Sequence, residues 1–190
     1  MIVVHPPLNM GLKDEAAEEL AGKGLFGDDA ASLHAALSHV TKLWAEAEQR
    51  ARGLDPALLD ERVNGEWSFL ETIRHLIFAT DAWVNGILLG NPPNFHPLGM
   101  PPAHAGDAMR DTLTVDARPT LDEVLAVRAE RQAMNAAAFA GVTDESMLHS
   151  SAGFDGAYTV AAAFQVIVYE EAEHLRFATR DLDRLTGVTA

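Results

Sequence analysis

Apolar residues recur at three- and four-residue spacing in four long stretches of the chain, which is the period of an amphipathic α-helix. The pattern predicts helices over about 28–52, 68–89, 120–140 and 159–185. Two of these begin with a capping box, Ser68 with Glu71 and Thr120 with Glu123. Gly and Pro residues follow the first three, where they end a helix. The sequence therefore predicts an all-α protein.

A long segment rich in Pro and Gly, residues 90–119, joins the second predicted helix to the third. A tight connection between neighbouring antiparallel helices needs only about 2 to 8 residues. An extended segment of this length reaches from one end of a helix to the other, so the two helices are expected to run parallel in a four-helix bundle. Residues 143–157 are expected to hold a short hairpin or an irregular loop.

The chain is long enough for one domain with a real core, so residues 1–190 are interpreted as a single domain. The bundle core is expected to span 28–186. Residues 1–27 are interpreted as an N-terminal extension with a short helix at about 13–21.

Two ionisable residues, Glu170 and His174, lie on the apolar stripe of the fourth predicted helix. A buried carboxylate needs a cation, a hydrogen-bond network or a wetted pocket, and residues four apart on a helix are neighbours. Glu171 falls beside this stripe and is given no role. The alternative is an ordinary surface pair or a hydrogen-bonded core histidine. The stripe comprises Ala163, Ile167, Glu170, His174, Phe177 and Asp181.

His75 lies on the second predicted helix on a stripe of small residues, which would leave free volume beside its imidazole. The alternative is that these residues merely allow close helix packing. Glu71, one turn earlier, is interpreted as a cap and not as a ligand. The small residues are Thr72, Ala79, Ala82 and Gly86.

Taken together, His75, Glu170 and His174 predict a three-ligand metal site between facing helices, open to water or substrate. The chain has no cysteine, so thiolate ligands and disulfides are excluded. Nitrogen and oxygen ligands suit a divalent transition metal, and Zn, Ni, Fe and Mn remain open.

The chain carries 28 acidic and 14 basic residues, a formal charge of −14 that repels phosphate backbones and anionic lipids. Nucleic acid is therefore not expected as a partner. No apolar run approaches the roughly 18 to 20 residues that span a bilayer, and Pro6 and Pro7 interrupt the apolar start. A cytoplasmic protein without a membrane partner is expected.

Residues 66–76 (Glu-Trp-Ser-Phe-Leu-Glu-Thr-Ile-Arg-His-Leu), with 78–83 after them, are similar to the first metal-ligand helix of the DinB-like superfamily. Residues 170–174 (Glu-Glu-Ala-Glu-His), with 177–182 after them, resemble the last helix of bacterial members. The resemblance extends over about 28–186.

The resemblance implies a four-helix bundle of up-down-down-up order with a metal held by three side chains, usually histidines. Many members carry His-x-x-x-His on the last helix. Here Glu170 takes the first position, as in the branch that includes mycothiol-dependent maleylpyruvate isomerase. Members of known activity use a low-molecular-weight thiol, such as mycothiol or bacillithiol, in isomerisation or S-transfer.

The first functional hypothesis is therefore a metal-dependent enzyme that activates a thiol and directs it at a small electrophilic substrate. A metal-binding or stress-response module without turnover is the second, and a structural bundle with fortuitous histidines is the third. A homodimer remains open. Trp67 is interpreted as helix packing, and no role is assigned to the histidines at 5, 34, 39, 96, 104 and 149.

Overall fold

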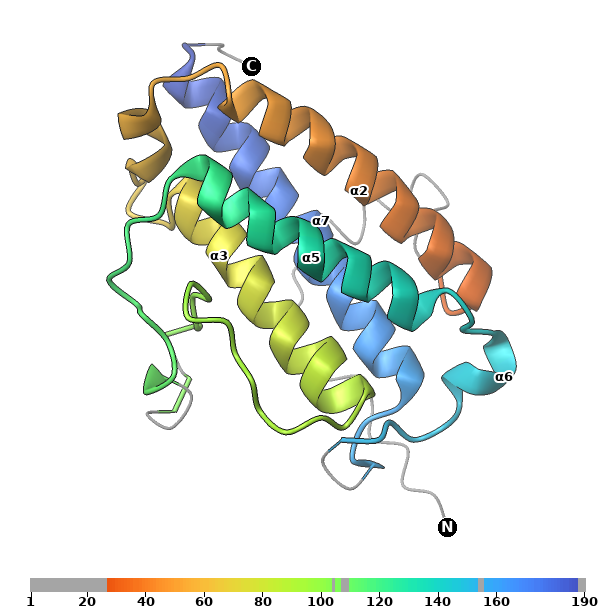
Figure 1. The fold of residues 1–190 in the computed structure, drawn as a ribbon. Helices are drawn as coiled ribbons and strands as arrows, with labels where there is room; N and C mark the ends of the chain where they lie inside the picture. Colours follow the sequence, from red (N-terminus) through yellow and green to blue (C-terminus); the bar gives the residue numbers. More distant parts are fainter. Residues whose placement is uncertain (1–26, 104, 107–109, 154–155, 188–190) are drawn as a thin grey trace.

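The computed structural model describes residues 27–103, 105–106, 110–153 and 156–187. The short helix expected at 13–21 lies outside the described residues. Over these ranges the protein is helical, and its one β feature is an isolated bridge between Ser150 and Thr159. The elements are α2 (Ala30–Ala51), η1 (Pro56–Asp60), α3 (Phe69–Thr80), η2 (Asp81–Leu88), α5 (Leu121–Phe139), α6 (Asp144–Met147) and α7 (Val160–Leu185) (Figure 1).

The long helices begin where the sequence predicts, because side chains cap their free N–H groups. Both bonds of the capping box are present at Ser68 and Glu71 on α3 and at Thr120 and Glu123 on α5. On α7, the Thr159 side chain accepts from the N–H of Ala162. The interpretation of Glu71 as a cap is thereby confirmed.

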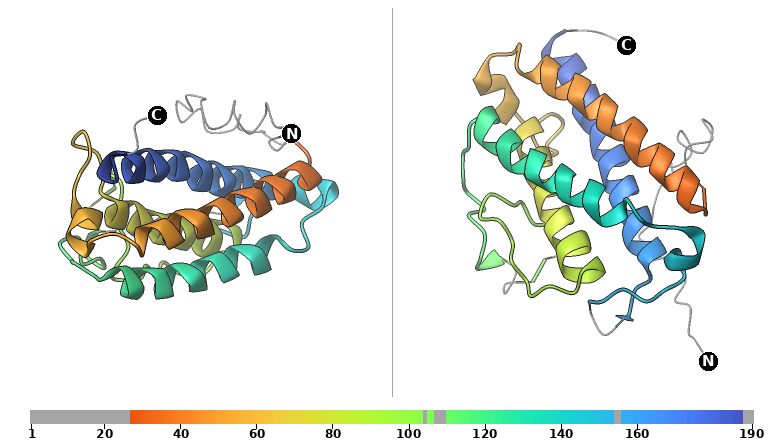
Figure 2. Two further views of the ribbon diagram at one scale, coloured as in Figure 1. Left: turned by 90° about the horizontal axis from the view of Figure 1, so that it is seen from above. Right: turned by 45° about the vertical axis from the view of Figure 1, so that its right-hand side comes forward.

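In Figure 1, α2 and α7 run in one direction and α3 and α5 in the other. α7 packs against both α2 and α3, and α3 also packs against α5. Figure 2 shows the same helices from above and in an oblique view. Their apolar faces meet in one core, which includes Leu33, Val40, Trp44, Phe69, Ile73, Ile77, Val124, Phe139, Phe164, Ile167 and Val168.

A buried arginine fastens segment 90–119 against α3. Arg74 is 1% exposed and donates hydrogen bonds to the backbone carbonyls of Leu98, Thr114, Val115 and Ala117 at 2.8 to 3.0 Å. Its own backbone carbonyl accepts from the N–H of Met100 at 3.0 Å. One planar guanidinium with several donors thus holds two stretches of the segment at once.

The second predicted helix ends at Leu88, close to its predicted end, but its last part, Asp81–Leu88, is a π-helix and not the α-helix that the apolar period indicates. Asp81 is buried there, where it pairs with Arg131 of α5 at 2.8 Å and accepts from the N–H of His96. At the other end, Gly153 donates to the carbonyl of Ile87 at 2.8 Å. Contacts with segments that are distant in the sequence therefore hold this part of the helix in the wider π-helical conformation.

The irregular segment expected at 143–157 contains helix α6, and the bridge to Thr159 closes it. Among the described residues, no helix combines the length and the apolar content that crossing a bilayer requires.

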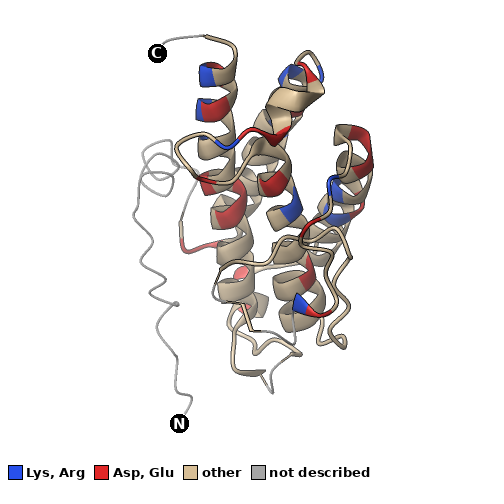
Figure 3. Cartoon of the chain, turned by 90° about the vertical axis from the view of Figure 1, so that its left-hand side faces the viewer, with Lys and Arg blue, Asp and Glu red and all other residues tan. Residues whose placement is uncertain are grey.

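Acidic and basic positions are interspersed along the helices in the view of Figure 3. Several of them form ion pairs between elements, such as Arg50 with Asp183 and Arg180 with Glu66. Part of the acidic charge therefore serves to join helices.

We expect Glu71→Gln to lower the free energy of unfolding at pH 7 by about 1 to 2 kcal/mol. Burial raises the pKa of Glu71, but hydrogen bonds from Arg62 and from the N–H of Ser68 outweigh it and bring the pKa below its ordinary value. A lowered folded-state pKa contributes stability above the unfolded-state pKa, and this contribution is lost as the pH falls through the folded-state value.

Urea unfolding of the wild type and the variant at pH 7 and at about pH 3.5 measures this effect. The difference between the two proteins should shrink at the lower pH. Glu123→Gln is the comparison at an exposed capping position: hydrogen bonds from Thr120 also lower the pKa of Glu123, so its difference should shrink in the same direction but start smaller. A difference that stays the same at both pH values would contradict the electrostatic explanation.

Candidate metal centre

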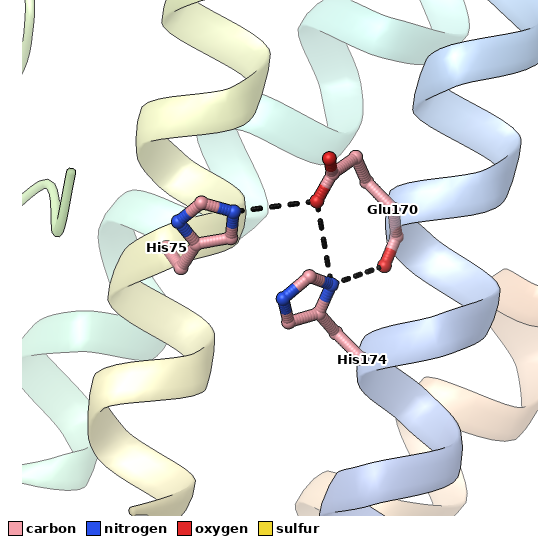
Figure 4. Close-up of side chains that lie close together, drawn as sticks. All are labelled: His75, Glu170 and His174. Carbon is pink, nitrogen blue, oxygen red and sulfur yellow. Dashed lines mark hydrogen bonds and ion pairs between the residues drawn. The ribbon is translucent and has the colours of Figure 1, made fainter. Parts of the chain in front are cut away.

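The three predicted ligands converge, although His75 comes from α3 and the other two from α7 (Figure 4). One ligand atom of each residue lies within 4.8 Å of the others. The Oε2 atom of Glu170 is 3.3 Å from His75 Nε2 and 3.3 Å from His174 Nδ1. The three side chains are only 8%, 12% and 15% exposed for His75, Glu170 and His174. The arrangement has the dimensions of a site for a single ion.

Backbone carbonyls orient both imidazoles. His75 Nδ1 lies 3.0 Å from the carbonyl oxygen of Met100, and His174 Nδ1 lies 2.8 Å from the carbonyl oxygen of Glu170. A carbonyl only accepts, so each Nδ1 carries a proton, and each Nε2 is left to hold either a second proton or a metal ion. Such a second partner on a histidine is typical of metal ligands.

His75 Nε2 faces a carboxylate oxygen of Glu170 at 3.3 Å. Two acceptors at this distance, largely shielded from water, need a proton or a metal cation between them. The two imidazoles and the carboxylate are therefore a suitable set of ligands for a cation.

Ionisation in the site favours the metal-binding forms. Burial raises the pKa of Glu170, but the hydrogen bond with His75 and the electrostatic attraction of the two histidines outweigh it and lower the pKa below its ordinary value. Burial lowers the pKa of His174, and the neighbouring Glu170 carboxylate offsets this only in part. An anionic carboxylate and a neutral imidazole are the forms that bind a metal.

Glu171 is a further buried acidic residue of α7 that the sequence analysis passed over. It lies outside the ligand cluster, as its helical position predicted, yet it is only 5% exposed. Its carboxylate pairs with the buried Arg128 of α5, and its backbone carbonyl accepts from Trp44 Nε1 at 3.0 Å. Glu171 therefore has a structural role, because removing it would leave the Arg128 charge buried without its partner.

Trp67 borders the centre, which the sequence analysis did not predict. Its ring centroid is 4.5 Å from that of His75 and 6.1 Å from that of His174. The Phe78 ring centroid is 6.1 Å from that of His75, and Phe95 stacks on Phe78 at 4.9 Å. In the sequence, the one indication that Trp67 lies near His75 is its position directly before Ser68, the cap of the same helix.

The described histidines outside this cluster have other surroundings. His96 accepts from the N–H of Leu98 through Nδ1, and His34 Nε2 lies 3.0 Å from the carbonyl oxygen of Val142. His149 is exposed. His5 and His104 lie outside the described residues.

A helical fold in which two histidines and a glutamate meet defines a candidate metal-binding helical protein. The profile of the DinB superfamily matches residues 39–178, a range that contains all three ligands. The chain belongs to the DinB superfamily. Comparisons with curated proteins and with solved structures each found no match.

We expect the purified protein to carry about one transition-metal ion per chain, and His75→Ala and His174→Ala each to lose most of it. Metal content measured by mass spectrometry after mild purification checks this. Chelation should also lower the melting temperature, since the ion binds the folded state. His149→Ala is the control, and full metal occupancy in either ligand variant would remove that residue from the centre.

Glu170 is tested by two substitutions. Glu170→His should retain the metal, because His-x-x-x-His keeps the two donors one turn apart, whereas Glu170→Leu should lower the affinity by about 10-fold or more. Titration of the apo forms with Zn(II) and Ni(II), followed by bound metal and thermal stability, distinguishes them. The control is Asp183→Asn on the same helix, because the ion pair of Asp183 with Arg50 is largely exposed, whereas that of Glu171 with Arg128 is buried. Normal binding by Glu170→Leu would show that the carboxylate is not a ligand.

Proposed function

We propose that this protein is a metal-dependent enzyme that activates a low-molecular-weight thiol for attack on a small electrophile. The observation that carries the proposal is the close contact of His75 Nε2 with the Glu170 carboxylate, within a cluster completed by His174. His75, Glu170 and His174 would hold one divalent ion such as Zn, Ni, Fe or Mn. When bound there, the ion supplies positive charge that lowers the pKa of a thiol beside it.

The residues around the centre have distinct tasks in this proposal. The Met100 carbonyl holds the His75 ring in the orientation that points Nε2 at the centre. Glu170 supplies the negative charge that offsets part of the charge of a divalent ion. The Trp67 ring shields the two imidazoles from water on one side, which strengthens electrostatic interactions at the centre.

The choice of a thiol rests on the sequence resemblance, since Glu170 at the first position of the last-helix motif is shared with the branch of mycothiol-dependent maleylpyruvate isomerase. Mycothiol or a similar thiol is thus the proposed cosubstrate. The order up-down-down-up for α2, α3, α5 and α7 belongs to the same proposal. The directions of the helices in Figure 1 and the superfamily match support it.

A second candidate is a metal-binding module without turnover. Three carboxylates that neighbour the ligands along α3 and α7 are held in ion pairs, and so are poorly placed to act as a general base. Glu71 pairs with Arg62, Glu171 with Arg128, and Asp181 with Arg180. This observation favours binding without proton transfer from these groups.

Turnover assays separate the two candidates. We expect the metal-loaded protein to consume mycothiol with an electrophile, or to isomerise maleylpyruvate in its presence. His174→Ala should reduce the rate on the order of 100-fold or more, because a metal ion contributes several kcal/mol to such reactions. Loss of free thiol and product formation are followed by mass spectrometry.

Cobalt substitution provides a direct test of thiol contact. Coordination of a thiol by Co(II) in the protein should add a sulfur-to-metal charge-transfer band when mycothiol is added, and the apo protein with mycothiol serves as the blank. A Co(II)-loaded protein with neither a spectral change nor turnover would refute thiol activation. Retained metal binding in that case would support the second candidate.

A further inference from the structure

Trp67 contacts ligands from both helices that form the candidate metal centre. Its ring centroid lies 4.5 Å from that of His75 on α3 and 6.1 Å from that of His174 on α7. The side chain itself belongs to neither helix, because Trp67 precedes Ser68, the N-cap of α3. The position of the ring therefore depends on the short segment before the helix, residues 61–67, and on the contacts that hold this segment in place.

A tight turn shapes this segment. Asn64 and Gly65 both have left-handed backbone angles, with φ of 56° and 76°, and the N–H of Glu66 donates to the carbonyl of Val63 at 3.1 Å. Two consecutive left-handed residues closed by such a bond are typical of a type I′ turn, for which Asn-Gly is a preferred sequence. The turn reverses the chain, so that the next two residues, Glu66 and Trp67, return to the bundle.

Ion pairs tie the segment to both ligand-bearing helices. On one side of the turn, Arg62 Nη2 lies 2.6 Å from Glu71 Oε1 of α3. On the other side, the Glu66 carboxylate accepts a hydrogen bond from Arg180 of α7. Arg180 is itself oriented, since its guanidinium also donates to Asp181 at 2.8 Å. The segment is therefore fastened to two helices that pack against each other and that each supply ligands.

The pair of Glu66 with Arg180 lies directly beside Trp67 in the chain, so a change in this pair reaches the ring through a single peptide bond. The two side chains are 46% and 27% exposed. Ion pairs that are open to water contribute little to the free energy of unfolding. Removing the pair should therefore change the position of the Trp67 ring more than it changes the stability of the bundle.

We propose that Glu66 and Arg180 are positioning residues, which hold the Trp67 ring against the two histidine ligands and so slow the loss of the bound ion. The inference rests on the metal-binding role proposed above. A ring that contacts both imidazoles restricts their rotation and blocks the approach of water or a chelator from that side.

The rate at which the zinc-loaded full chain loses Zn(II) to an excess of chelator tests the proposal. Glu66→Gln removes the ion pair and should speed the loss by about tenfold, the lower end of the effect of groups that orient metal ligands. Trp67→Ala should speed the loss at least as much. Glu66→Gln should add nothing in the Trp67→Ala background, because both changes act through the same ring.

The contribution of Arg180 is measured by combining it with its partner. Arg180→Gln should also speed the loss of Zn(II), and the double variant Glu66→Gln, Arg180→Gln should lose the ion no faster than Arg180→Gln alone. Glu61→Gln is the matched control, since Glu61 is an exposed acidic residue of the same segment. It removes the same charge and should leave the rate unchanged. The melting temperatures of metal-free Glu66→Gln and Glu61→Gln should both stay close to that of the wild type.

The metal-free protein provides a readout that does not depend on a bound ion. The indole N–H signal of Trp67 in an NMR spectrum is identified by its absence in Trp67→Phe. This signal should shift in metal-free Glu66→Gln and stay in place in Glu61→Gln. The measurement reports the position of the ring whether or not the variant changes the loss of Zn(II).

Two results would overturn the positioning role while the metal centre stands. One is an indole signal of Trp67 that does not move in Glu66→Gln. The other is an acceleration by Glu66→Gln that is as large in the Trp67→Ala background as in the wild type, which would mean that the carboxylate acts by its charge and not through the ring. Failure of the proposed function is recognised separately, as wild-type protein that binds no Zn(II).

Discussion

The hydrogen bonds of one buried guanidinium hold the candidate centre in place. Arg74 fastens segment 90–119 to α3 through four backbone carbonyls. The same segment carries Met100, whose N–H bonds to the backbone of Arg74 and whose carbonyl meets the ring of His75. The orientation of His75 is therefore set by the residue beside it in the sequence, Arg74, acting through the segment that follows the helix.

Adjacent carboxylates on α7 face different partners. Glu170 meets His75 of α3 and His174, while Glu171 meets Arg128 of α5. Successive residues on a helix point about 100° apart, so one helix can supply a ligand to the centre and an ion pair to the core in consecutive positions. In each case a buried negative charge lies beside groups that can neutralise it, which is the condition for placing a carboxylate away from water.

Local patterns predicted much of this structure. The helical period and the capping boxes located the long helices, and the spacing of Glu170 and His174 with His75 on a facing helix identified the cluster. Features that depend on distant contacts were missed. The π-helix is held by the pairing of Asp81 with Arg131, which is fifty positions away in the sequence. The spacing of apolar residues along one helix cannot predict such a contact. The same holds for the burial of Glu171.

The adjacent positions of Glu170 and Glu171 also limit how α7 can move. A rotation of this helix about its axis that withdrew Glu170 would pull Glu171 from Arg128 and so break a buried ion pair. A displacement of segment 90–119 near Met100 breaks only hydrogen bonds before it frees the ring of His75. The centre is thus bounded by a buried ion pair on the α7 side and by hydrogen bonds on the side of segment 90–119.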